Sequence, residues 1–286
     1  MTSATEEALG RLGDQRMAGL VAVVTGAGTE RGIGNGQAIS LTLASHGASV
    51  VCVDRVAERA EQVVEKIRKE GGEGLAVEAD VTSVEDCDRI AVEADRAFGR
   101  VDALVNTAGI VSRNGLRARV PGGMLGEWEH LDLDDWEHVF RVNVTGPMLC
   151  TRALAPALTR RGGAVVFVGT TMADQWYGGG SLAYGTSKAA LEGLSLVVAG
   201  ALGPKGVRSN LLVIGQVLAP HIEAGAEAMG EQGQQMLEHR RLSSLLQVDG
   251  TPFDVAMTAL YLVSPDSRWI TGQKIFVDGG AARTMR

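Results

Sequence analysis

A tyrosine and a lysine four residues apart are the first candidates for chemistry in this sequence. They are Tyr184 and Lys188, at the end of the stretch GTTMADQWYGGGSLAYGTSK, residues 169–188. Residues four apart on a helix share one face, so the ammonium would lie beside the phenol. A free phenol has a pKa of about 10, too high for a good base at neutral pH, and a neighbouring ammonium lowers that pKa by stabilising the tyrosinate. The pair therefore predicts proton transfer to or from a substrate oxygen.

Two hydroxyl side chains stand shortly before this pair. Thr170 and Thr171 follow an apolar run at 164–168, and Thr171 lies thirteen residues before Tyr184. A threonine hydroxyl donates and accepts hydrogen bonds, so one placed beside Tyr184 would bind the same substrate oxygen. The alternative is purely structural: a solvated Tyr and Lys on an amphipathic helix, and threonines that suit the end of a strand.

Short apolar runs alternate with helical patterns along nearly the whole chain. Such runs are typical of strands covered on both faces, and strand–helix alternation predicts a parallel sheet. We predict strands at 20–25, 48–54, 74–80, 102–106, 163–170, 207–214 and 274–278. The early helices are expected at 36–47, 56–70 and 84–98. The fold class is therefore α/β, a doubly wound parallel sheet of about seven strands with helices on both faces.

Composition and charge narrow the function classes. The chain has 286 residues and a net charge of -7, which argues against a nucleic-acid partner. It shows neither an apolar signal-peptide core near residue 1 nor a run long enough to span a membrane, so we expect a cytoplasmic location. The scattered Cys52, Cys87 and Cys150 read as buried thiols rather than as disulfides or a metal site.

No Pro/Ser-rich linker divides the chain. We expect a flexible N-terminal arm at 1–17 and a single dinucleotide-binding and catalytic domain at 18–286. Within that domain, residues of about 216–248 form a Met-bearing helical stretch that reads as a mobile lid over the substrate.

A glycine-rich segment, TGAGTERGIG, follows the first predicted strand at residues 25–34. Glycines let the backbone approach a pyrophosphate, and the next helix supplies free N–H groups and a positive dipole end. Asp54 ends the second strand, twenty residues beyond Gly34, where an acid would bind the adenosine ribose. Because its carboxylate would repel a 2′-phosphate, we predict NAD(H) in preference to NADP(H). Arg31 in the same loop would instead attract a 2′-phosphate and favour NADP(H), or it is simply solvated.

Taken together, these motifs resemble the short-chain dehydrogenase/reductase family over about residues 20–280. The motifs that carry the resemblance, in chain order, are TGAGTERGIG, Asp54, ADV at 79–81, NTAG at 106–109, Asn143 in RVNVTG, YGTSK at 184–188 and ITGQKIFVDGG at 270–280. Their combination in this order is far more specific than any one of them. The resemblance implies a Rossmann fold, nicotinamide-dependent redox chemistry and a homotetramer.

The resemblance also implies a role for each matching residue. Tyr184 would be the general acid/base, Lys188 its electrostatic partner, Thr171 the hydroxyl in the family's serine position, and Asn143 the anchor of a water-mediated proton path. Residues that would contact the cofactor, in chain order, are Gly26, Gly28, Gly32, Ile33, Gly34, Asp54, Arg55, Asp80, Val81, Asn106, Ala108, Gly109, Tyr184, Lys188, Gly215 and Val217.

Four positions depart from the family pattern. Five residues separate Gly26 from Gly32, where three are usual, so the phosphate turn must bulge. Thr171 replaces the serine, Ile214 replaces the proline of a Pro-Gly pair, and Ala219 stands where a threonine contacts the nicotinamide. The last two changes affect how tightly the nicotinamide would be positioned.

Three segments are expected to close over the substrate beyond the carboxyl ends of the strands: 111–131, 173–180 and 220–247. With Thr171, the candidate substrate contacts are Trp176, Tyr177 and His221. We therefore expect an NAD-dependent oxidoreductase that interconverts a secondary alcohol and a ketone. The alternatives are a catalytically impaired nucleotide-binding or regulatory protein, and a dehydratase or epimerase on the same scaffold.

Overall fold

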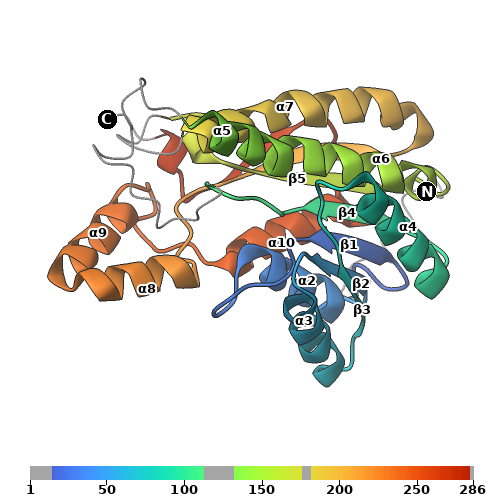
Figure 1. Cartoon of the computed structure of the whole chain (residues 1–286), viewed down its shortest axis with the longest axis horizontal. Helices are drawn as coiled ribbons and strands as arrows, with labels where there is room; N and C mark the ends of the chain where they lie inside the picture. The colour runs from blue at the N-terminus through green and yellow to red at the C-terminus, as the bar shows by residue number, and fades with distance from the viewer. Residues whose placement is uncertain (1–14, 113–131, 176–181, 284–286) are drawn as a thin grey trace, which may run out of the picture.

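A seven-stranded parallel sheet forms the centre of the molecule in the computed structural model, which describes residues 15–112, 132–175 and 182–283 (Figure 1). The strand order is β3-β2-β1-β4-β5-β6-β7. The strands are β1 Val21–Thr25, β2 Ser49–Asp54, β3 Glu73–Glu78, β4 Ala103–Asn106, β5 Ala164–Thr170, β6 Arg208–Ile214 and β7 Lys274–Val277. The prediction of a doubly wound parallel sheet is confirmed, and each strand boundary lies within two residues of the expected one.

Helices cover both faces of the sheet (Figure 1). Apolar side chains of α2 (Asn35–Ser45), α3 (Ala57–Lys69) and α10 (Pro252–Val263) pack into one core cluster. Those of α4 (Val84–Phe98), α6 (Gly146–Leu158) and α7 (Leu182–Leu202) pack into the other. The strand order reverses between β1 and β4, and this is the point where open α/β sheets bind ligands beyond their carboxyl ends.

Local sequence explains where the surface helices begin and end. The Ser83 hydroxyl accepts a hydrogen bond from the Asp86 amide at the start of α4, and Gly99 ends that helix with a φ of 69°. At α10, which starts at Pro252, Thr251 and Asp254 form a reciprocal capping box. These caps fix the ends of helices whose apolar stripes face the sheet.

The N-terminal boundary differs from the expected one. Met17 is fully buried in the core beside α2, and its amide donates to the carbonyl of His46 at 2.9 Å. The folded part of the chain therefore includes a residue that the sequence analysis assigned to the arm. Residues 1–14 of that arm lie outside the described residues.

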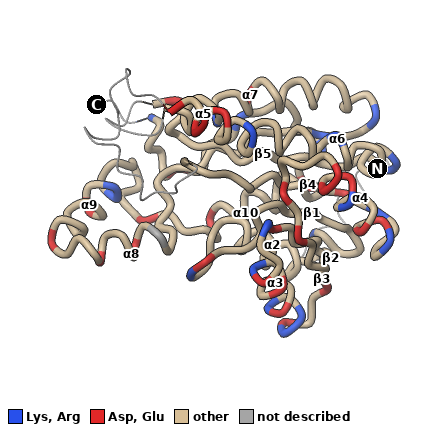
Figure 2. Tube along the Cα trace, viewed as in Figure 1, with Lys and Arg blue, Asp and Glu red and all other residues tan. Residues whose placement is uncertain are grey.

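The segment at 216–248 contains two helices, α8 (Pro220–Met229) and α9 (Glu231–Leu242), which project from the body at the left of Figure 1. A short α5 (Leu133–Phe140) precedes α6, and one turn of π-helix, Arg141–Thr145, joins them. Among the described residues, no helix combines the length and hydrophobicity needed to cross a bilayer. Basic and acidic residues are mixed along α3 and α4, as Figure 2 shows.

Candidate active site

The glycine turn after β1 is built for close backbone contact. Gly26 has a φ of 61°, and a Cβ at this position would lie 2.7 Å from the Cα of Ala108. A Cβ on Gly36, in the first turn of α2, would lie 2.0 Å from the Gly26 carbonyl oxygen. Gly34 is the N-cap residue of α2. The turn is therefore pressed against the loop after β4, and the N-terminus of α2 opens toward the space beyond the strands.

Asp54 stands at the end of β2 and is 8% exposed. Its Oδ2 accepts a hydrogen bond from the Gly28 amide at 3.0 Å, and its Oδ1 accepts one from the Val56 amide at 3.1 Å. These two bonds orient the carboxylate beside the glycine turn. Each oxygen keeps a further lone pair for a ribose hydroxyl. Arg55 is exposed next to it.

Asn106, at the end of β4, is the clearest indication that a ligand belongs beside the glycine turn. It is 1% exposed, yet neither its Nδ2 nor its Oδ1 has a hydrogen-bond partner among the described residues. Buried amides are nearly always paired, because an unpaired one costs about 1–3 kcal/mol. A polar group bound between the glycine turn and β4 would pair this amide, so the site fits a dinucleotide.

Two further residues expected to contact the cofactor, Asp80 and Val81, lie in the loop after β3. Asp80 accepts a bond from the Thr82 amide and donates its own amide to Asp86 Oδ2, both at 2.8 Å. Val81 is 8% exposed, and a Cβ on Gly146 would lie 2.8 Å from its Cγ2. The loop after β3 is thus fixed against both α4 and α6.

Tyr184 lies in the first turn of α7 and is half-buried. Burial raises the pKa of its phenol, while a hydrogen bond with the side chain of Thr170 lowers it. The Thr170 hydroxyl also accepts a bond from the Met172 amide at 3.3 Å, which caps the short 3-10 turn Thr171–Ala173. Thr171 is 1% exposed at the same strand end. The Thr170 hydroxyl is therefore bonded to the phenol, and Thr171 is the next residue along the chain.

Lys188, one turn further along α7, is 5% exposed. Its Nζ donates to the carbonyl oxygen of Val168 at 2.9 Å. Desolvation lowers the pKa of Lys188 to about 8. A buried ammonium that is paired with a carbonyl rather than a carboxylate retains its positive field for other groups in the site.

Asn143 sits in the π-helical turn and is fully buried. Its Oδ1 accepts from the Ile110 amide at 2.8 Å, and its Nδ2 donates to the Ile110 carbonyl and the Ser187 hydroxyl, both at 2.9 Å. The side chain thus joins the loop after β4 to α7. Pro147 has no N–H for the carbonyl of Asn143, which explains why the α-helical pattern breaks here. The missing donor can be read from the sequence, whereas the π-turn and the bonds to Ile110 and Ser187 cannot.

Gly109 marks the point where these parts converge. A Cβ on this glycine would lie 3.1 Å from Lys188 Nζ and 3.2 Å from Asn143 Oδ1. Its lack of a side chain therefore lets the ammonium and the amide approach the loop after β4. The end of β4, the π-turn and α7 form one continuous polar site.

The remaining expected site residues lie further away or outside the described chain. Gly215 packs against Asp278, since a Cβ there would lie 2.6 Å from the Asp278 Cα, and Val217 is 9% exposed among core residues. Trp176 and Tyr177 lie outside the described residues, and His221 is in α8, where its side chain is not described. Ile33 packs against the core beside α2.

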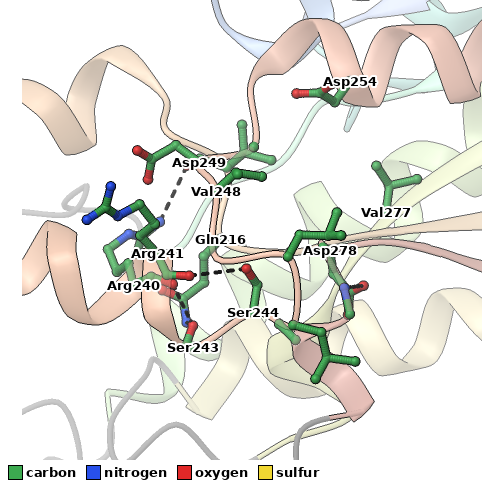
Figure 3. A pocket seen from close by; sticks show the side chains of 18 of the residues that line it. Gln216, Arg240, Arg241, Ser243, Ser244, Val248, Asp249, Asp254, Val277 and Asp278 are labelled. Atoms are coloured by element: carbon green, nitrogen blue, oxygen red, sulfur yellow. Dashed lines mark hydrogen bonds between the residues drawn. The ribbon is translucent and has the colours of Figure 1, made fainter.

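A cavity of about 660 Å³ lies beside the β6–α8 connection. Figure 3 shows Gln216, Arg240, Ser244 and Asp278 among its lining residues. Among the described residues, Gly215 and Val217 are the expected site residues that line the cavity, and Tyr184, Lys188 and the glycine turn do not line it.

Comparisons with known proteins give matches along almost the whole chain. The family model described as enoyl-(acyl carrier protein) reductase matches residues 26–282. The short-chain reductase protein NovJ of Streptomyces niveus is 33% identical over 91% of this chain and 93% of its own length. The 7alpha-hydroxysteroid dehydrogenase of Escherichia coli (strain K12) is 32% identical over 94% of this chain and 97% of its own.

A solved structure of a short-chain dehydrogenase/reductase from Burkholderia xenovorans matches with a TM-score of 0.85 and 32% identity, covering 95% of this chain and all of the other. A dehydrogenase/reductase from Sinorhizobium meliloti 1021 matches with a TM-score of 0.77 and 29% identity, covering 95% of this chain and 98% of the other. Fold, motif order and similarity along almost the whole chain agree: this protein belongs to the short-chain dehydrogenase/reductase family of oxidoreductases, which use a nicotinamide cofactor.

Proposed function

We propose that the protein is an NAD-dependent oxidoreductase that interconverts a secondary alcohol and a ketone. The observation that carries the proposal is the buried ammonium of Lys188, which is bonded to the Val168 carbonyl one helical turn from Tyr184. Burying a charge without a counter-ion is costly, so a fold retains it where its field is used. A tyrosinate forming at Tyr184 is the group that this field stabilises.

The protein's own residues would move one proton. In the reductive direction, the Tyr184 phenol donates its proton to the oxygen of the forming alcohol; in the oxidative direction, the tyrosinate removes it. Burial raises the pKa of the phenol, and the hydrogen bond with Thr170 opposes that rise. The Lys188 ammonium would stabilise the tyrosinate. Thr171 would bind the substrate oxygen and hold it within reach of Tyr184.

The cofactor would lie between the glycine turn and β4. Gly26 and Gly34 would approach its pyrophosphate, Asp54 its ribose, and Asn106 a polar group at the centre of the cleft. The bound nicotinamide supplies the hydride acceptor or donor, which no side chain can replace. NAD(H) is proposed over NADP(H) because Asp54 carries the same charge as a 2′-phosphate.

The relatives support the substrate class. The name 7alpha-hydroxysteroid dehydrogenase describes the oxidation of a ring hydroxyl, which is a secondary alcohol. At 32% identity this similarity supports the type of reaction and leaves the individual substrate open. A small molecule that bears a hydroxyl or carbonyl group is the proposed partner of the site.

A panel of secondary alcohols and ketones, followed by the absorbance of reduced nicotinamide, tests the proposal. We expect turnover with at least one substrate class and tighter binding of NADH than of NADPH at one ionic strength. Saturable NADH binding with no turnover across the panel would favour the catalytically impaired nucleotide-binding protein, for which the four departures from the family pattern are the supporting features. Conversion of a substrate without net change in the cofactor would favour a dehydratase or epimerase.

A further inference from the structure

The glycine turn is two residues longer than usual in the family, and its extra length is held in a defined shape. The Thr29 hydroxyl donates to the Arg31 carbonyl at 3.1 Å. The Gln37 amide, oriented to satisfy both of its ends, donates to the Gly32 carbonyl and accepts from Lys66 Nζ, each at 2.9 Å. The turn is therefore attached to α2 and, through Lys66, to α3.

The longer turn also brings an acidic residue to α3. Glu30 Oε1 lies 2.6 Å from Nη2 of Arg59, and this bond spans 29 positions in the sequence. The Glu30 side chain is 77% exposed and that of Arg59 is 27% exposed. The ion pair therefore joins the glycine turn to the N-terminal end of α3 near the surface.

The Cβ of Arg59 lies near Asp54, the carboxylate proposed to bind the ribose. A Cβ on Gly28 would lie 2.4 Å from the Cβ of Arg59 and 2.9 Å from Oδ2 of Asp54. The stem of Arg59 and the carboxylate of Asp54 therefore flank the same glycine. The guanidinium, however, is directed to Glu30 in the turn.

The surroundings of this ion pair are otherwise basic. A cavity of about 230 Å³ is lined by the turn from Thr29 to Ile33 and by Gln37, Arg59, Gln62 and Lys66. Arg31, Arg59 and Lys66 supply three positive charges at this cavity, and Glu30 is the single acid among the described residues that line it. Without Glu30, this side of the glycine turn would attract a phosphate group.

We propose that Glu30 is a second determinant of the NAD(H) preference, because it holds the Arg59 guanidinium away from an incoming 2′-phosphate. The inference rests on the proposed cofactor preference and assigns a role to the lengthened turn. Asp54 repels the added phosphate, while Glu30 prevents its neighbouring cation from attracting it. Asp54 and Glu30 thus both favour NAD(H) over NADP(H), but by different mechanisms.

The test measures dissociation constants of NADPH and NADH by fluorescence titration at one ionic strength. Glu30→Gln removes the charge and keeps the shape of the side chain, and it frees Arg59. We expect NADPH to bind about five- to tenfold tighter, the scale of one partly exposed charge-assisted hydrogen bond, with NADH affinity nearly unchanged. Glu61→Gln is the matched control, since it removes the same charge from an exposed position of α3 two residues from Arg59, and it should leave both affinities nearly unchanged.

A double variant separates release of Arg59 from a general loss of negative charge. In Glu30→Gln/Arg59→Ala, the NADPH gain should disappear. A gain that persists without Arg59, an equal gain in Glu61→Gln, or no gain in Glu30→Gln would each overturn the inference. The parent protein tests the proposed cofactor preference separately, because tighter binding of NADPH than of NADH by the parent would refute it. The role of Glu30 is read from a different comparison, that of NADPH binding by Glu30→Gln and by the parent.

Discussion

The ammonium of Lys188 donates a 2.9 Å hydrogen bond to the carbonyl of Val168, two residues before the hydroxyl that is bonded to Tyr184. Helix α7 is thereby fastened to β5 at the strand end where the proton would be transferred. The bond fixes the position of a positive charge without neutralising it, since a carbonyl carries only a dipole. The site thus keeps a buried charge at some expense to the stability of the fold.

Replacing Lys188 with methionine should make the protein more stable while abolishing turnover. The pKa of Lys188 is lowered from 10.5 to about 8 by desolvation, so between these two pH values the unfolded chain binds more protons than the native state. The free energy of unfolding of the parent therefore rises with pH across this window, and the penalty is complete below pH 8. At pH 7 we expect Lys188→Met to unfold with a free energy higher by up to about 3 kcal/mol.

Urea unfolding of parent and variant at several pH values between 6 and 10.5 measures this effect. The difference in the free energy of unfolding between parent and variant should shrink above pH 8, because Lys188 of the native parent is then neutral and its burial costs less. Lys205→Met, which removes an exposed lysine, should track the parent at every pH. Parallel curves for the parent and Lys188→Met would show that the ammonium is not buried at a cost.

Tyr184→Phe separates the effect of proton transfer from the effect of side-chain packing. The ring remains in place at the start of α7, and only the hydroxyl is lost. Turnover should fall by about a hundred- to ten-thousand-fold, the usual contribution of a positioned acid/base. NADH affinity, measured by fluorescence titration, should stay close to that of the parent. Turnover at the parent rate would remove Tyr184 from the mechanism.

Thr170 and Thr171 should have separable effects on rate and on pH dependence. Thr170→Val removes the hydrogen bond that lowers the pKa of Tyr184, so the pH of half-maximal alcohol oxidation should move upward. Thr171→Val should reduce turnover with little movement of the pH profile, because it removes a substrate contact, and Thr171→Ser should keep most activity. A Thr171→Val variant as active as Thr171→Ser would limit Thr171 to a structural role.

The sheet could be predicted from the sequence because each strand is a short apolar run between turn residues, and the glycine turn and Asp54 follow in a fixed order. Backbone partners could not be predicted in the same way. The carbonyls of Val168 and Ile110 carry no residue signature, although they hold Lys188 and Asn143. The choice between Thr170 and Thr171 also depends on three-dimensional side-chain direction, which spacing alone left open. Met17 was placed outside the fold because a single apolar residue after a polar segment shows no periodicity.

Asn143→Ala should weaken the joint between the loop after β4 and α7. Removing the amide leaves the N–H and carbonyl of Ile110 and the Ser187 hydroxyl without this partner in a buried site. We expect a loss of at least about 2 kcal/mol in the free energy of unfolding, since each buried unpaired group costs about 1–3 kcal/mol. Ser187→Ala, which removes one of the three partners, should cost less in the same urea titration. Equal stability of Asn143→Ala and the parent would contradict this structural role.

The homotetramer that the family resemblance implies is tested through α7, the helix that carries Tyr184 and Lys188. Its outward side exposes Leu196 and Val197, at 63% and 66%, in the same helix as Tyr184 and Lys188. Two adjacent branched apolar side chains in water are better explained by a contact with a second copy than by a monomer.

We expect light scattering to give the mass of a tetramer, and Leu196→Arg/Val197→Glu to give a smaller species with unchanged circular dichroism. Val92→Glu, at a residue 65% exposed on α4, is the control and should leave the mass unchanged. A monomer at micromolar concentration, or a double variant of unaltered mass, would refute α7 as the contact.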